Sequence, residues 1–145
     1  GGVDWGMPLQ VSHTTVNARD AHALSVFWAA LLDYAEDPDD PNAPCHEECM
    51  IYSPDLRHRI LFIEVQELGG PGRTHFDLRP TDGSRDQAVD RALALGAREV
   101  ADRRTPEGRG WVVLADPEGN EFCLLRSDEE RMIAGDPIGP QPLDA

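Results

Sequence analysis

Two segments of the chain show the same hydrophobic pattern, a strand-like run followed by an amphipathic helix. Residues 9–17 are rich in Val and Thr and lead to Asp20, a favoured helix N-cap. Residues 73–79 alternate strictly between polar and apolar positions, and Ser84 and Gln87 that follow have capping-box spacing. Each segment therefore predicts a strand that passes directly into a helix.

A histidine occupies the same place in both segments. His13 lies seven residues before Asp20, and His75 lies seven residues before Asp82, which gives a period of 62 residues. Self-similarity at a fixed period indicates a repeated supersecondary unit. We expect two such units around a pseudo-dyad, each with a histidine on its first strand.

The helices and the later strands follow from periodicity. In the first helix the apolar stripe is expected to face a sheet; it consists of Leu24, Phe27, Trp28, Leu31 and Leu32. The second helix is expected to end near Leu95, because Gly96 suits the left-handed position after a helix. The other expected elements are strands at 49–53, 59–66, 98–101, 111–115 and 121–125 and a helical turn at 128–133.

Turn residues separate these elements. Residues 36–44 contain two prolines within the stretch, a third at its end, three aspartates and a glutamate, which predicts a surface loop. Residues 69–72 form a short glycine-rich break between the two copies. Residues 116–120 have Pro and Gly where a tight hairpin turn requires them.

The domain organisation follows from this pattern. Residues 7–127 are expected to form one domain of two modules, 7–68 and 73–127. Residues 1–6 show no periodicity and are expected to be a leader outside the domain. Residues 128–145 are expected to be a peripheral C-terminal tail, because their later part is rich in Pro and Gly.

Composition narrows the classes of function. The chain has 145 residues, 40% of them apolar, which suits one compact core. Its formal net charge of −14 opposes binding to nucleic acid and to anionic lipid. No apolar run reaches the roughly 20 residues of a membrane helix, and no signal peptide is evident, so we expect a cytoplasmic protein. An odd number of cysteines (Cys45, Cys49 and Cys123) favours free thiols over a disulfide framework.

Several motifs resemble one known family. They are Phe27–Leu32, His75–Leu78, Leu95–Ala97 and Trp111–Cys123 with its Asp-Pro-Glu-Gly-Asn turn. Together they resemble the glyoxalase-like, bleomycin-resistance branch of the vicinal oxygen chelate superfamily, over about residues 8–126. The resemblance implies an α+β fold of two βαβββ modules related by a pseudo-dyad, with a curved mixed sheet that forms an open half-barrel. It also implies a homodimer and a small-molecule ligand.

The resemblance also implies a metal site. Family enzymes take ligands from the first and last strands of each module, which places His13 and His75 at the two first-strand positions. The usual last-strand glutamate falls at Cys123, a departure from the family pattern. Glu121 lies two residues earlier on the same strand face, so it is the expected carboxylate ligand and proton-transfer residue. Two histidines and a carboxylate suit Fe, Zn or Ni.

Other residues are expected to contact a ligand. Asp77 and Arg79 share the polar strand face with His75, and Cys123 lies at the expected ligand position. Trp111 begins a strand and is expected either to pack or to line the concavity. A structural interpretation is also open, in which His75 pairs with Asp77 and Glu121 pairs with Arg79.

Two other histidines are expected to be exposed to solvent. His22 lies at a helix start, and His58 lies beside a turn.

Two functions from different classes follow. The first is a metal-dependent lyase or dioxygenase that acts on a small oxygenated substrate, as the paired histidines suggest. The alternative is a metal-free protein that binds a small ligand or drug, as Cys123 in place of the carboxylate suggests. A structural or regulatory partner domain has no positive signal in the sequence.

Overall fold

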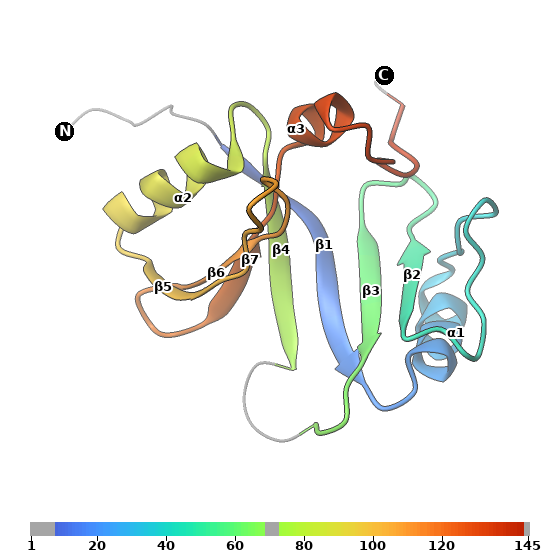
Figure 1. Cartoon of the computed structure of the whole chain (residues 1–145). Helices are drawn as coiled ribbons and strands as arrows, with labels where there is room; N and C mark the ends of the chain where they lie inside the picture. Colours follow the sequence, from blue (N-terminus) through green and yellow to red (C-terminus); the bar gives the residue numbers. More distant parts are fainter. Residues whose placement is uncertain (1–7, 69–72, 144–145) are drawn as a thin grey trace. The chain divides into compact units, whose positions relative to one another are not determined.

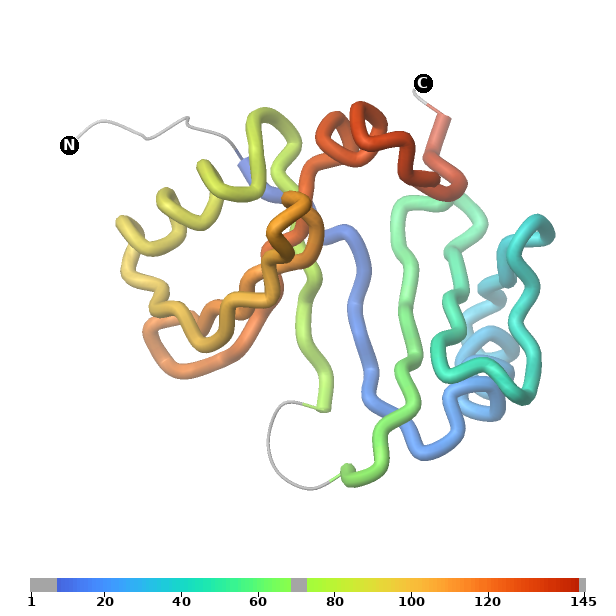
Figure 2. Tube along the Cα trace, in the orientation of Figure 1, coloured from blue at the N-terminus to red at the C-terminus, as the bar shows by residue number. Residues whose placement is uncertain are grey.

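The computed structural model describes residues 8–68 and 73–143, so the expected leader at 1–6 and the glycine-rich break at 69–72 lie outside the described residues. Contacts divide the chain into two compact units. The first comprises the residues up to Ser12 together with Phe76–Ile138, and the second comprises His13–His75 together with the residues from Gly139 onward. Each unit combines mixed β-structure with helix, and the expected α+β class is confirmed (Figures 1 and 2).

In the second unit a helix packs beside a small mixed sheet. The elements are β1 (Leu9–Ala18, of which the part from His13 belongs here), α1 (Ala21–Leu32), β2 (Glu48–Tyr52) and β3 (Arg59–Glu64). Strand β3 pairs antiparallel with β2 and parallel with β1. The Asp20 side chain accepts a hydrogen bond from the backbone N–H of Ala23, which confirms the expected N-cap of α1.

The first copy of the repeat, which forms most of the second unit, has two strands after α1 where the resemblance implies three. In place of the third, Ala35 makes an isolated bridge to Tyr52, the last residue of β2. The chain beyond this bridge is the expected acidic loop, in which the prolines lack the N–H that a strand ladder needs. This loop therefore cannot extend the edge of the sheet.

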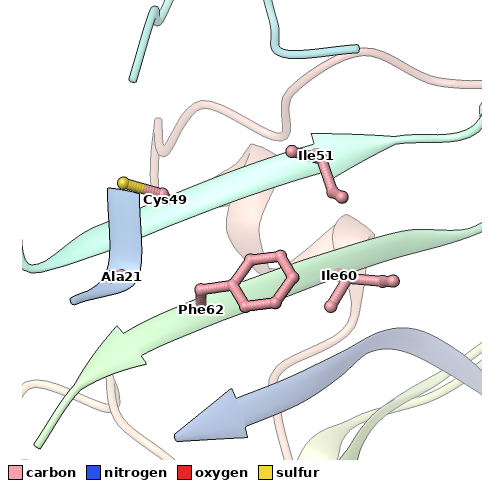
Figure 3. Packing of buried hydrophobic residues seen from close by; sticks show 5 residues of the cluster. All are labelled: Ala21, Cys49, Ile51, Ile60 and Phe62. Atoms are coloured by element: carbon pink, nitrogen blue, oxygen red, sulfur yellow. The ribbon is translucent and has the colours of Figure 1, made fainter. Parts of the chain in front are cut away.

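The core of this unit lies between α1 and the two-stranded hairpin. Figure 3 shows its buried members, Ala21, Cys49, Ile51, Ile60 and Phe62, with the Phe62 ring between the strands and the helix start. The helix contributes a narrower strip than its apolar stripe predicts. Leu24 and Trp28 pack on the core, whereas Phe27 is 56% exposed and Leu31 is 64% exposed. The expectation that the whole stripe faces a sheet is wrong, because the small buried residues Ala21 and Ser25 make the close contact.

The first unit has a larger sheet with a helix on one face. Its elements are β4 (Thr74–Pro80, of which the part from Phe76 belongs here), α2 (Arg85–Ala94), β5 (Arg98–Asp102), β6 (Val112–Ala115), β7 (Glu121–Leu124) and α3 (Asp128–Ile133). The strand order is β4-β7-β6-β5, with β4 and β7 parallel and the other pairs antiparallel. Its core joins α2 to β6 and β7 through Ala88, Val89, Val112, Leu114 and Leu124.

A capping box fixes the start of α2, and a glycine turn closes its end. Ser84 and Gln87 form the expected capping box, and Gly96 has a φ of +114° just beyond the helix C-cap. Arg85 begins the helix, and its backbone N–H donates to Glu130 Oε1 at 2.7 Å. The helix is therefore anchored to α3 at one end and closed by a glycine turn at the other.

No helix among the residues that the structure describes is long and apolar enough to cross a bilayer.

Candidate metal centre

The register of β4 and β7 places two polar side chains opposite each other. Asp77 pairs with Cys123, while Leu78 pairs with Leu124. Because side chains alternate along a strand, Asp77 and Cys123 share one face, and Leu78 and Leu124 point to the other, toward α2. The β4–β7 pair therefore separates a polar face from the apolar core.

Three potential ligands converge on this polar face. His75 precedes Asp77 by two residues on β4, and one ligand atom from each of His75, Asp77 and Cys123 lies within 4.8 Å of the others. Asp77 and Cys123 are buried, with 7% and 9% exposure, and His75 is half-buried. Among the described residues, one group of at least three His, Cys, Asp or Glu side chains is close enough together to hold a metal ion, and it consists of these three residues.

The electrostatics of this group keep Cys123 protonated. Burial raises the pKa of its thiol to about 12, and the negative charge of Asp77 together with the side-chain hydrogen bond between the two adds to the increase. Burial of a carboxylate beside a thiolate would place two like charges in a poorly solvated site. The thiol is therefore a proton donor to Asp77 and not a nucleophile at neutral pH.

The donor set fits a divalent transition metal. Imidazole nitrogen, carboxylate oxygen and thiolate sulfur are all ligands of Zn²⁺, and three protein ligands leave positions open for other groups. Three atoms no more than 4.8 Å apart lie within about 2.8 Å of a common point, whereas metal–ligand bonds measure about 2.0–2.3 Å. A contraction of about half an ångström, within reach of side-chain rotation, would close such a site.

The other two expected metal ligands do not join this group. His13 is buried on β1, at 9% exposure, and Glu121 is exposed at the start of β7. Neither belongs to a ligand group of this kind within the part of the chain that the structure describes. Glu121 shares the β7 face of Cys123, and its charge contributes to the raised pKa of that thiol.

The remaining expected contact residues lie at the margins. Arg79 donates from Nε to Ser12 Oγ at 3.2 Å and from Nη1 to the Arg126 carbonyl oxygen at 2.8 Å. Trp111 precedes β6, and its ring is partly exposed to solvent. Arg79 is thus tied to structure around it, and Trp111 is accessible to a ligand.

The two histidines expected to be exposed, His22 and His58, differ in exposure. His58 is exposed, as expected, and its Nδ1 lies 2.7 Å from the Tyr34 hydroxyl. His22 is half-buried at the start of α1.

Sequence reasoning assigned Asp77 to ligand contact and did not pair it with Cys123. Alternation within each strand was visible in the sequence, and it correctly placed Asp77 and His75 on one face. The pairing of Asp77 with Cys123 depends on the parallel register of β4 with β7, which no local pattern encodes. The signal that could have found it is that Asp77 and Cys123 each stand between two apolar residues of a strand.

Paired strand–helix–strand units with a His/Asp/Cys cluster on the polar face of a strand pair define a small α+β protein with the ligand chemistry of a metal site. A family model described as "Glyoxalase-like domain" matches residues 13–125, and the chain belongs to this family. The resemblance seen in the motifs is thereby confirmed. No curated protein matches the chain.

A solved structure agrees with this fold. A glyoxalase/bleomycin resistance protein/dioxygenase superfamily member from Vibrio splendidus 12B01 is similar over 81% of this chain and 97% of its own, with 12% identity and a TM-score of 0.52. A family enzyme of the same description from Burkholderia phytofirmans PsJN is 20% identical over 78% of this chain and 94% of its own, with a TM-score of 0.32. At these identities the likeness shows the fold alone.

Proposed function

We propose that this chain binds a divalent metal, Fe, Zn or Ni, through His75, Asp77 and Cys123 and acts as a lyase or dioxygenase on a small oxygenated substrate. The observation that carries the proposal is the convergence of three different ligand types on one strand face. A metal bound there would polarise adjacent substrate oxygens as a Lewis acid. Membership of the glyoxalase-like family supports this chemistry.

The protein residues around this face would have distinct roles. Glu121, exposed and on the same face of β7, is placed to move a proton to or from a bound substrate. Trp111 offers a partly exposed aromatic surface for an apolar part of the substrate. The burial of Asp77 and Cys123 limits access of water to their side of the site.

Metal uptake tests the proposal directly. Protein purified without chelator is titrated with Co²⁺, and a sulfur-to-cobalt charge-transfer band reports a thiolate ligand. We expect one equivalent bound and a band that is lost in Cys123→Ala. The matched control is Cys45→Ala, because Cys45 is an exposed cysteine outside the cluster. No stoichiometric uptake of cobalt, zinc or iron, or a band that persists in Cys123→Ala, would reject the site.

Two further variants distinguish the expected ligands. His75→Gln is expected to weaken uptake at least tenfold, while His22→Gln, on α1, is expected to leave it unchanged. If His13→Gln weakens uptake as strongly, the metal uses the ligand set that the family resemblance implies. If neither histidine matters, the proposal fails for these residues.

A metal-free ligand-binding function is the second candidate. It is favoured by the hydrogen bond between the Cys123 thiol and Asp77, which satisfies both buried groups without an ion. A thermal-shift screen of small aromatic and oxygenated compounds on chelator-treated protein tests this function. Stabilisation by a compound together with no metal uptake would favour it, whereas metal-dependent turnover would reject it.

We also propose that the protein is a cytoplasmic homodimer. Its three cysteines are free thiols, which suits a reducing compartment. Phe27, Leu31 and Val26 on α1 are all more than half exposed, and exposed apolar clusters of this kind mark interaction surfaces. Light scattering after size exclusion is expected to give twice the chain mass, and Phe27→Glu is expected to give the monomer. A monomeric wild-type protein would reject the dimer.

A further inference from the structure

The unit that contains α2 encloses a cavity of about 230 Å³ between this helix and the sheet. Its apolar lining includes Leu9, Leu78, Ala88, Ala92, Ala97 and Phe122. Leu78 and Phe122 alternate with Asp77 and Cys123 along β4 and β7, so the cavity lies on the opposite face of the sheet from the candidate metal centre. Figure 1 shows α2 alongside the strands that form this layer.

Small side chains leave the space open. The helix presents Ala88 and Ala92 to the cavity, and Ala97, which lies between the end of α2 and β5, also lines it. Leu95, the large side chain at the helix end, also lines the cavity and is 65% exposed. A helix that packed only for stability would place larger residues at these positions, because voids in a core are destabilising.

Both ends of α2 are held, so the helix cannot simply collapse onto the sheet. At its start the capping box and the bond from the Arg85 backbone N–H to Glu130 fix the first turn. At its end Gly96 approaches the hairpin turn, where a Cβ on it would lie 3.7 Å from Pro117 Cγ. The cavity therefore lies beside a helix whose start is held by hydrogen bonds and whose end comes close to the hairpin turn.

The charged residues at the cavity define which ligand it can accept. Asp116 has both carboxylate oxygens engaged by its own turn, through the backbone N–H groups of Glu118 and Asn120 and the Asn120 side chain. Arg91 is the cation of the lining and is half-buried. The lining therefore offers a large apolar surface with one cation, Arg91, while the Asp116 carboxylate is already held by three N–H groups of its own turn.

We propose that this cavity is a second ligand site that accepts a compact aromatic molecule, with any acidic substituent placed beside Arg91. A dry apolar cavity of about 150 Å³ accepts benzene, so scaling by volume gives about nine non-hydrogen atoms, the size of indole. This site is separate from the proposed metal function, because its lining lies on the other sheet face.

The test uses indole and indole-3-carboxylate with the full chain. Each is titrated while backbone amide shifts are followed by NMR, and we expect saturable binding with the largest shifts in α2 and in residues 116–122. Ala92→Leu fills the cavity and is expected to weaken binding at least tenfold. The matched control, Ala94→Leu, adds the same side chain at an exposed position of the same helix and is expected to bind as the parent protein does.

Further arms keep the proposal falsifiable. If Ala92→Leu does not fold, as judged by circular dichroism, Ala92→Val is used and is expected to weaken binding by a smaller factor. Arg91→Gln is expected to reduce the affinity for indole-3-carboxylate more than for indole. No saturable binding of either probe, equal binding by the two Leu variants, or shifts centred on Asp77 and Cys123 would overturn the proposal. Metal uptake is measured in a separate experiment, so the absence of indole binding would not bear on the proposed metal centre.

Discussion

Replacement of Arg85 by methionine is expected to destabilise the unit that contains α2 by about 2–4 kcal/mol. The Arg85 side chain is 4% exposed at the first turn of α2. Its Nη1 donates to the carbonyl oxygens of Gly108, Arg109 and Gly110 at 3.3, 3.0 and 3.1 Å. One buried cation thus closes the loop between β5 and β6 onto the helix.

The magnitude follows from the number of protons available. Nη1 carries two protons, so at most two of the three carbonyls receive a well-formed bond at once, each worth about 1.5–3 kcal/mol because the donor is charged. Water can replace part of this, since Gly108 and Arg109 are exposed. Methionine keeps an apolar stem in the buried position, so the loss of packing is small. About two thirds of the gross value of about 3–6 kcal/mol is therefore expected to be lost, which is about 2–4 kcal/mol.

Urea unfolding measures this loss. With a denaturant slope of about 2 kcal/mol/M, the midpoint is expected to fall by about 1–2 M at an unchanged slope. Arg98→Met, at an exposed position on β5, is the control and is expected to change stability by less than about 0.5 kcal/mol. Hydrogen exchange should accelerate in residues 103–111 of the Arg85 variant. A midpoint equal to that of the Arg98 variant would refute the role given to the three carbonyl contacts.

Three further predictions concern the same unit and the thiols. Gly110→Ala is expected to be several kcal/mol less stable than Gly108→Ala in the same urea assay. Both glycines have positive φ, but a Cβ on Gly110 would lie 2.1 Å from the Arg103 carbonyl oxygen, whereas nothing lies within 4 Å of a Cβ on Gly108. Equal losses of stability in the two variants would contradict this. Ellman's reagent is expected to label only the Cys45 thiol rapidly in the native protein. The other two thiols, of Cys49 and Cys123, are buried and have raised pKa values. Rapid labelling that persists in Cys45→Ser would contradict this prediction. Hydrogen bonds from the side chain and backbone of Arg104 lower the pKa of Asp102 to about 2, so its stabilising contribution is complete above about pH 4 and is lost as the pH falls toward 2. The melting temperature, measured from pH 5 to pH 2.5, should therefore fall less steeply with pH in Arg104→Gln than in the parent protein. An equal fall in the two proteins would show that this pair does not contribute to stability.

The positions of most elements could be predicted because their signals are local. The N-cap Asp20, the capping box at Ser84 and the glycine after α2 all act within one helical turn, and each is found where the sequence indicates. Phe27 on α1 shows the limit of such patterns. An apolar stripe tells which side of a helix is hydrophobic, but not how much of that side another element covers.

Features that depend on distant pairing could not be predicted in the same way. Arg85 is an ordinary arginine at the start of a helix in the sequence, and its role depends on three carbonyl groups in a loop more than twenty residues away. The Asp77–Cys123 pair likewise depends on strand register. The alternation of polar and apolar residues along β4 predicts the face on which the candidate site lies. The pairing of β4 with β7 determines which residues on that face are in contact.

Cys123 decides between the two proposed functions because a proton and a metal compete for the same sulfur. In the metal-free protein, the thiol and Asp77 satisfy each other, and burial with two nearby carboxylates raises the thiol pKa to about 12. A bound divalent metal would instead stabilise the thiolate, and it would turn the neighbouring negative charge of Asp77 from a repulsive into an attractive contribution. Burial beside Asp77 raises the pKa of any acid at this position, but a glutamate starts from about 4.3 and a cysteine from about 8.5, so the cysteine is the easier of the two to keep neutral at pH 7. The substitution therefore gives this chain a site that is stable when empty, and a metal can occupy it only if its bond to sulfur outweighs the cost of removing that proton.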